Sequence, residues 1–82
     1  MNRKIKLIWD FFGEDAADTA MHHAKHLKEF ADREKISTFE VDAIDLKNHA
    51  EAYMIIKEEN MLKVRDRLRP QRGQWVEKTS KP

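Results

Sequence analysis

The chain contains no cysteine among its 82 residues, which excludes disulfide bonds, thiolate zinc sites and cysteine nucleophiles. It has only two glycines and two prolines, and this scarcity beside 40% hydrophobic residues is typical of a folded domain. The longest unbroken apolar run, Ala52–Ile56, is much shorter than a helix that crosses a bilayer. No apolar signal-peptide segment follows the basic residues at the start, and we therefore expect a cytoplasmic protein with no membrane partner.

The sequence also lacks an excess of charge of one sign, because sixteen basic residues face fifteen acidic ones. A net charge of +1 argues against general attraction to nucleic acid or anionic lipid. A chain of this length forms one small domain, which we expect to span residues 1–79 with a frayed tail at 80–82. Small domains without disulfides often gain stability by pairing with a second copy, so we expect a homodimer.

Two periodicities divide the sequence into strands and helices. The first strand alternates apolar and mixed residues with a period of two, and later segments return to that period. A stripe of alanines with Leu27 at its centre repeats every three to four residues and predicts a long helix that packs closely against a sheet. The predicted elements are strands at 4–11, 37–46, 52–56 and 74–77, a helix at 14–34, and a helix from Met61 that ends before Pro70.

The strand at 37–46 changes phase in its middle. Its first half is apolar on the phase of Phe39, and its second half is apolar on the phase of Leu46. One extra residue reverses the facing of a strand, so we expect a bulge or a strong twist near Ala43.

The predicted order β-α-β-β-α-β is that of the ferredoxin-like, split βαβ fold. Right-handed crossovers then give an α+β domain with two helices on one face of a four-stranded antiparallel sheet. The other face stays open and carries Ile8, together with either Met54 and Ile56 or Tyr53 and Ile55, because the central strand is apolar in both phases. An apolar patch of this kind is typical of an interface.

The stretches Lys6–Phe11 and Leu68–Gly73 resemble those of short uncharacterised bacterial proteins. The element order is similar to that of the dimeric α+β barrel superfamily, in which two ferredoxin-like subunits pack sheet to sheet. The resemblance implies a homodimer of that type and carries no catalytic residue with it.

Three of the four histidines lie on the long predicted helix, and His22 and His26 have the i, i+4 spacing of helical metal pairs. A zinc site needs a third ligand, and the helical wheel places both side chains in solvent. We therefore predict no metal site and no cofactor. If the chain did bind a metal ion, His22 and His26 would be the candidate ligands. The wheel places His23 at the core boundary, beside Phe30 and Thr19.

A cavity on the open face would bring together a small set of polar residues. Asp10 and His49 are its candidate catalytic acid–base pair, and Trp9 and Tyr53 are its candidate ligand-binding residues. The simpler interpretation is that Asp10 forms an ion pair with Lys6 or with a neighbouring arginine.

The arginine-rich segment 65–72, followed by Trp75, is of a type that can hold phosphate or stack on a base. The split βαβ order is also that of the RNA-recognition module, which requires stacking aromatics on its central strands. Here the third strand offers a single aromatic residue, Tyr53, and no glycine. The pattern favours an ordinary solvated helix face over an RNA-binding one.

The sequence contains no signature of a particular reaction, and it favours a structural or interaction role over an enzymatic one. The leading hypothesis is a homodimeric interaction domain. The alternative is a small-molecule-binding protein or enzyme with a cavity on the open sheet face, and RNA binding is a further alternative.

Overall fold

The computed structural model describes residues 3–76, so the predicted end of the domain at residue 79 and the predicted tail at 80–82 lie outside the described residues. Seven elements follow one another along the chain. They are β1 (Lys4–Phe12), α1 (Ala16–Glu34), β2 (Thr38–Leu46), β3 (His49–Lys57), the short 3-10 helix η1 (Glu58–Asn60), α2 (Met61–Leu68) and β4 (Arg72–Val76).

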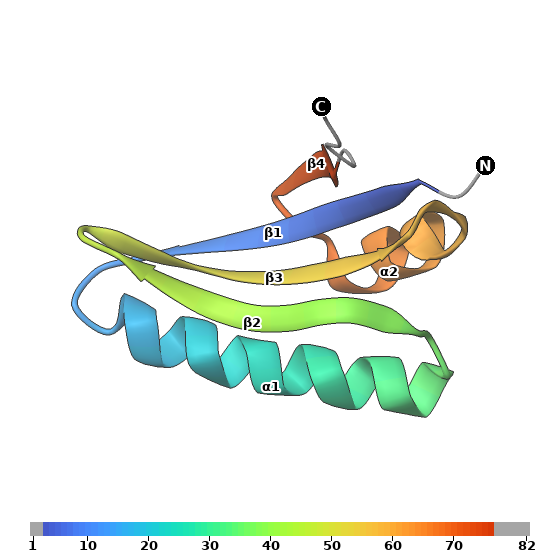
Figure 1. The fold of residues 1–82 in the computed structure, drawn as a ribbon. Coiled ribbons are helices and arrows are strands. Elements are labelled where there is room, and N and C mark those ends of the chain that lie inside the picture. The colour runs from blue at the N-terminus through green and yellow to red at the C-terminus, as the bar shows by residue number, and fades with distance from the viewer. Residues whose placement is uncertain (1–2, 77–82) are drawn as a thin grey trace.

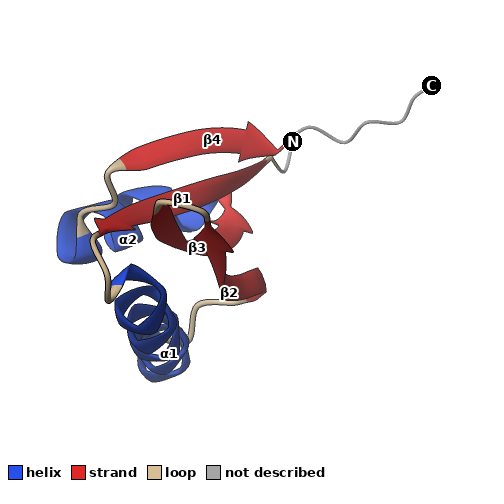
Figure 2. Ribbon diagram, turned by 90° about the vertical axis from the view of Figure 1, so that its left-hand side faces the viewer, coloured by secondary structure: helices blue, strands red, loops and turns tan. Residues whose placement is uncertain are grey.

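The four strands form one sheet in the order β2-β3-β1-β4, and every neighbouring pair is antiparallel. The α1 helix runs along one side of this sheet (Figure 1). Turning the molecule shows that α2 lies on the same side (Figure 2). The predicted α+β class, with a four-stranded antiparallel sheet and two helices, is confirmed.

The long helix forms because its alanine stripe combines high helix propensity with a narrow apolar face. Six residues of the predicted stripe and its shoulders are buried, whereas Ala17 of the stripe is only partly buried and Met21 of the shoulder is exposed. The buried residues are Ala16, Ala20, Ala24, Leu27, Phe30 and Ala31. The helix ends at Lys35, whose left-handed backbone (φ 57°) directs its N–H to the carbonyl of Asp32. Small side chains let this helix lie close to the sheet, where the larger core residues of the strands, such as Leu7, Trp9 and Met54, fill the space beside it.

The strand register determines which face of the sheet is the core. On β1, Leu7 lies opposite Met54 and Trp9 lies opposite Ala52, so these side chains point toward the helices. The Trp9 Nε1–H donates a hydrogen bond to the Leu68 carbonyl in α2 at 2.9 Å. One tryptophan therefore joins the central strand to the second helix. Of the two facings left open for β3, the structure has the one with Tyr53 on the open face.

The predicted bulge in the second strand is real, but its predicted position near Ala43 was wrong. The register shift lies between Thr38 and Glu40, so Phe39 is the extra residue. The two-residue turn before β3 fixes the pairing of the second half of β2, so Leu46 stays on the open face and no second shift is needed at Ala43. The irregularity consequently falls where the strand begins.

Within residues 3–76, the structure contains no helix that is both long enough and apolar enough to cross a membrane.

Candidate functional site on the open face of the sheet

The face of the sheet opposite the helices is not covered by any element within residues 3–76 (Figure 2). The register places four cations and four anions on it, so its formal charges balance. The cations are Lys4, Lys6, Lys57 and Arg72, and the anions are Asp10, Glu40, Asp42 and Glu51. His49 lies on the same face, at the end of the sheet next to the β2–β3 turn.

The most connected part of this face is an ion-pair cluster of Asp10, Glu51 and Arg72. Asp10 of β1 lies directly opposite Glu51 of β3, and two like charges in that position repel each other. Arg72 of β4 offsets the repulsion. Its Nε donates to Asp10 Oδ2 at 2.9 Å, and its Nη2 donates to Asp10 Oδ1 at 2.8 Å and to Glu51 Oε2 at 2.7 Å. The two carboxylates, Asp10 first, raise the pKa of Arg72 further, so the guanidinium keeps its charge.

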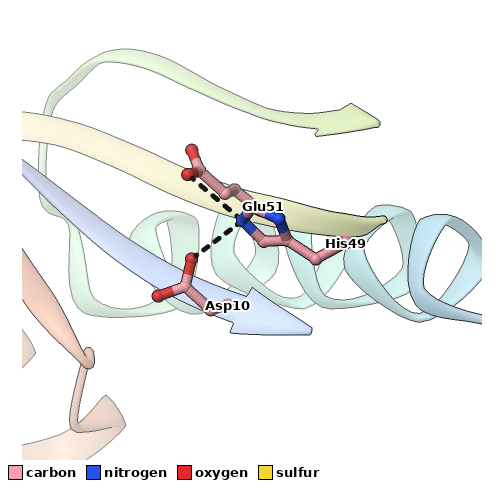
Figure 3. Close-up of side chains that lie close together, drawn as sticks. All are labelled: Asp10, His49 and Glu51. Carbon is pink, nitrogen blue, oxygen red and sulfur yellow. Dashed lines mark ion pairs between the residues drawn. The ribbon is translucent and has the colours of Figure 1, made fainter. Parts of the chain in front are cut away.

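His49 approaches the same two carboxylates from β3 (Figure 3). Its Nε2 lies 3.7 Å from Asp10 Oδ1 and 3.8 Å from Glu51 Oε2. The ring of Phe12 stacks on the His49 ring, with centroids 5.1 Å apart and an interplanar angle of 19°. One imidazole nitrogen and two carboxylate oxygens gathered at one place can bind a cation together.

Tyr53 forms a second polar contact farther along β3. Its hydroxyl donates a hydrogen bond to Glu40 Oε2 at 2.6 Å, and the Lys6 ammonium lies 4.5 Å from its ring centroid. The hydrogen bond to Glu40 is the main cause that raises the pKa of Tyr53 to about 12, and burial adds to it. The phenol is therefore a poor proton donor near neutral pH.

The structure brings together two of the four residues that the sequence proposed for a cavity. Asp10 and His49 are neighbours on the open face, and Asp10 also forms the ion pair with an arginine that the simpler interpretation proposed. Tyr53 lies on that face with its hydroxyl engaged by Glu40. Trp9 does not belong with them, because the alternation of β1 points its side chain into the helix-side core, where it is 5% exposed.

Sequence reasoning missed Glu51 and Arg72 as members of the cluster. Both are ordinary charged residues until the register places them beside Asp10. A signal was present in β3, where His49, Glu51 and Tyr53 alternate with two alanines. Assigning the alanines to the core would have placed all three polar side chains on the open face.

The helical histidines separate as the sequence predicted. His22 and His26 are both exposed, with ring centroids 4.6 Å apart. His23 is partly buried, but its neighbours are Trp9 and Phe11, with ring centroids at 5.2 and 5.5 Å. Burial, with a smaller contribution from His26, lowers the pKa of His23. Its Nε2 is buried without a hydrogen-bond partner among the described residues.

The arginine-rich segment does not form one continuous basic surface. Arg65, Arg67 and Arg69 are exposed, whereas Arg72 is held by carboxylates. Arg65 Nε also lies 3.6 Å from Asp66. This division disfavours the use of the whole segment to hold phosphates.

A groove lies beside the cluster, between the start of α1 and the β2–β3 turn. Its volume is about 470 Å³, and it is lined by Gly13, Glu14, Ala16, Ala17, Asp45, Leu46, Lys47, Asn48 and His49. Of the residues proposed for a cavity, His49 contributes to its wall. The groove is therefore at the end of the sheet rather than over the middle of the open face.

A scan against protein-family models, a search of curated proteins and a search of solved structures each found no match to this chain.

Proposed function

We propose that this chain is a ferredoxin-like interaction domain that forms a homodimer by packing its open sheet face against that of a second copy. The strand order β2-β3-β1-β4, with two crossover helices, supports the split βαβ arrangement. The resemblance to the dimeric α+β barrel superfamily points to the same mode of assembly.

The observation that carries the proposal is that the open face exposes large apolar side chains at both of its ends. Phe12 and Leu46 lie at the end near the β2–β3 turn, and Val76 lies at the other end, where Phe39 also packs against the ammonium of Lys4. Phe12 is 73% exposed, which is unusual for a phenylalanine in a strand. A second sheet would cover these side chains at the usual face-to-face spacing of about 10 Å.

The charges between these two ends suit an isologous contact. In a two-fold dimer each copy presents the same surface, so a face of one net sign would repel its partner. Four cations and four anions on this face remove that obstacle. Homodimer interfaces usually have fewer charges at their centre, so we expect a reversible dimer rather than an obligate one.

Light scattering coupled to size-exclusion chromatography tests the dimer. We expect a mass that rises with protein concentration from 9.8 kDa toward twice that value. Phe12→Ser should shift the equilibrium toward the monomer, and at dilutions where the parent is also monomeric it should melt at the temperature of the parent, because an exposed side chain contributes little to the fold.

Met21→Ser is the matched control, since Met21 is 63% exposed on α1, away from the open face. This variant should dimerise like the parent chain. A parent that stays monomeric at every concentration, or equal losses of dimer in the two variants, would contradict the proposal.

The groove beside His49 favours a second candidate, a small-molecule-binding protein or enzyme. Its volume lies in the range of small-molecule sites, about 300–1,000 Å³. A thermal-shift screen against small organic acids, amines and phosphates tests this function, with His49→Gln as the control because His49 lines the groove. Stabilisation that His49→Gln abolishes would support a ligand site in the groove, whereas a flat screen would speak against it.

A cytoplasmic location belongs to the first proposal. It is compatible with a chain that has no cysteine and needs no oxidising compartment to fold.

A further inference from the structure

The polar cluster on the open face contains a set of atoms that could bind a metal ion. Asp10, His49 and Glu51 each offer one ligand atom, and these atoms lie within 4.8 Å of one another (Figure 3). The three side chains are only 14–28% exposed, and they come from two paired strands, which limits their freedom to separate. Two carboxylate oxygens and one imidazole nitrogen make a ligand set that suits zinc and neighbouring transition ions.

Arg72 already binds the oxygens that such an ion would need. Its Nη2 bridges Asp10 Oδ1 and Glu51 Oε2, and these are the two atoms that face His49 Nε2. The guanidinium thus supplies the positive charge that lets two opposed carboxylates remain ionised. It extends from the edge strand β4 and is 49% exposed, so it can rotate into solvent without disturbing the core.

We propose that Asp10, His49 and Glu51 form a site for a divalent transition-metal ion, and that Arg72 is its built-in competitor. With Arg72 bound, the cluster is an ion-pair network. With Arg72 displaced, the two carboxylates and His49 hold the ion and leave a fourth position open to water or another ligand. This proposal holds for a single chain and does not depend on the homodimer.

Binding an ion requires the three ligand atoms, which lie within 4.8 Å of one another, to move closer together. Ligands that lie about 2.0–2.2 Å from a zinc ion are separated by roughly 3.3–3.6 Å when tetrahedral. His49 Nε2 is 3.7 and 3.8 Å from the two oxygens, so it must move closer by a few tenths of an ångström. The two oxygens, which Arg72 now bridges, must approach each other by up to about 1.5 Å once the guanidinium leaves. The Phe12 ring is stacked on the imidazole, so it limits the tilt of the His49 ring during this movement.

Isothermal titration of the full chain with ZnCl₂ tests the site directly. We expect one Zn²⁺ per chain in the parent protein and no measurable binding in His49→Gln. Arg72→Gln should bind Zn²⁺ more tightly by at least about tenfold, the scale on which neighbouring polar groups change metal affinity. An arginine that merely stabilises the cluster would produce the opposite effect on metal binding.

The exposed His22 and His26 pair supplies the matched control, because its i, i+4 spacing makes it a second candidate for zinc contact among residues 3–76. A double variant with glutamine at both positions should keep the affinity of the parent. Circular dichroism establishes that each variant is folded, and Arg72→Lys replaces Arg72→Gln if the charge is needed for folding, with the same direction of change. Light scattering on the same samples reports the dimer separately.

Three outcomes would overturn the proposal. The first is no zinc binding by either the parent or the Arg72 variant. The second is binding that survives His49→Gln and disappears with the helical pair. The third is an Arg72 variant, folded by circular dichroism, that binds zinc no more tightly than the parent.

Discussion

Replacing His23 with leucine should make the domain more stable. His23 is packed between Trp9 and Phe11 on the helix side of the sheet, and its buried Nε2 has no hydrogen-bond partner among residues 3–76. A buried polar atom without a partner costs about 1–3 kcal/mol. Leucine removes that atom and keeps an apolar contact with both rings, although it gives up their ring–ring interaction. Because the histidine is only partly buried, we expect a net gain of about 1 kcal/mol near neutral pH.

The same variant should also change how stability depends on pH. Burial lowers the pKa of His23 in the folded state below its ordinary value of 6.5. As the pH falls through 6.5, His23 becomes protonated in the unfolded chain while it is still neutral in the folded chain, so the free energy of unfolding decreases. The loss continues down to the folded pKa and cannot exceed about 1.4 kcal/mol per pH unit for one proton. His23→Leu should remove this component.

Urea denaturation at about pH 7.5 and about pH 5.5, on either side of the ordinary histidine pKa, measures both effects. His22→Gln is the control, because His22 is exposed and its loss should change stability by less than about 0.5 kcal/mol. An alanine at position 23 should be more damaging than one at 22 or 26. The reasoning fails if His23→Leu shows the same loss of stability between the two pH values as the parent.

Two other predictions concern the core and the open face. Leu27→Asp should unfold the domain, because Leu27 is 1% exposed and an unpaired buried charge costs several kcal/mol. That cost is comparable with the free energy of unfolding of a small domain, roughly 5 kcal/mol in total. A cooperative melt near the parent temperature would contradict the placement of Leu27 on the buried face of the helix. The chain has a single tyrosine, so its absorbance titration should show the Tyr53 midpoint near 12, moving toward its ordinary value in Glu40→Gln. Since the folded pKa is the raised one, the parent should lose this contribution to stability as the pH rises from about 10 toward 12.

The elements that the sequence predicted best are those whose residues repeat a pattern over many positions. The alanine stripe around Leu27 specified both the existence and the facing of α1, and the alternation around Leu7 did the same for β1. In both cases each residue adds to one periodic signal, so a single residue that departs from the pattern does not change the predicted element or the face it buries. The main helix and the first strand could therefore be predicted without knowledge of contacts between residues far apart in the sequence.

The candidate site was less predictable because it depends on register. Asp10, Glu51 and Arg72 are far apart in the sequence, and they meet only because β1 pairs with β3 on one side and with β4 on the other. A shift of one residue in β3 would move Glu51 to the opposite face. The position of the bulge was missed for a related reason, since a turn outside β2 fixes its pairing.

The central place of β1 in the sheet has a consequence for how the protein folds as it is made. Residues 4–12 are synthesised before both of their partner strands, residues 49–57 and 72–76. While the intervening chain is being synthesised, the apolar β1 segment has no strand paired with either of its edges. Contacts of such long sequence separation slow folding, and unpaired strands of this kind aggregate readily. Until the β2–β3 hairpin has been made, the segment around Leu7 and Trp9 therefore has no strand to pair with on either edge.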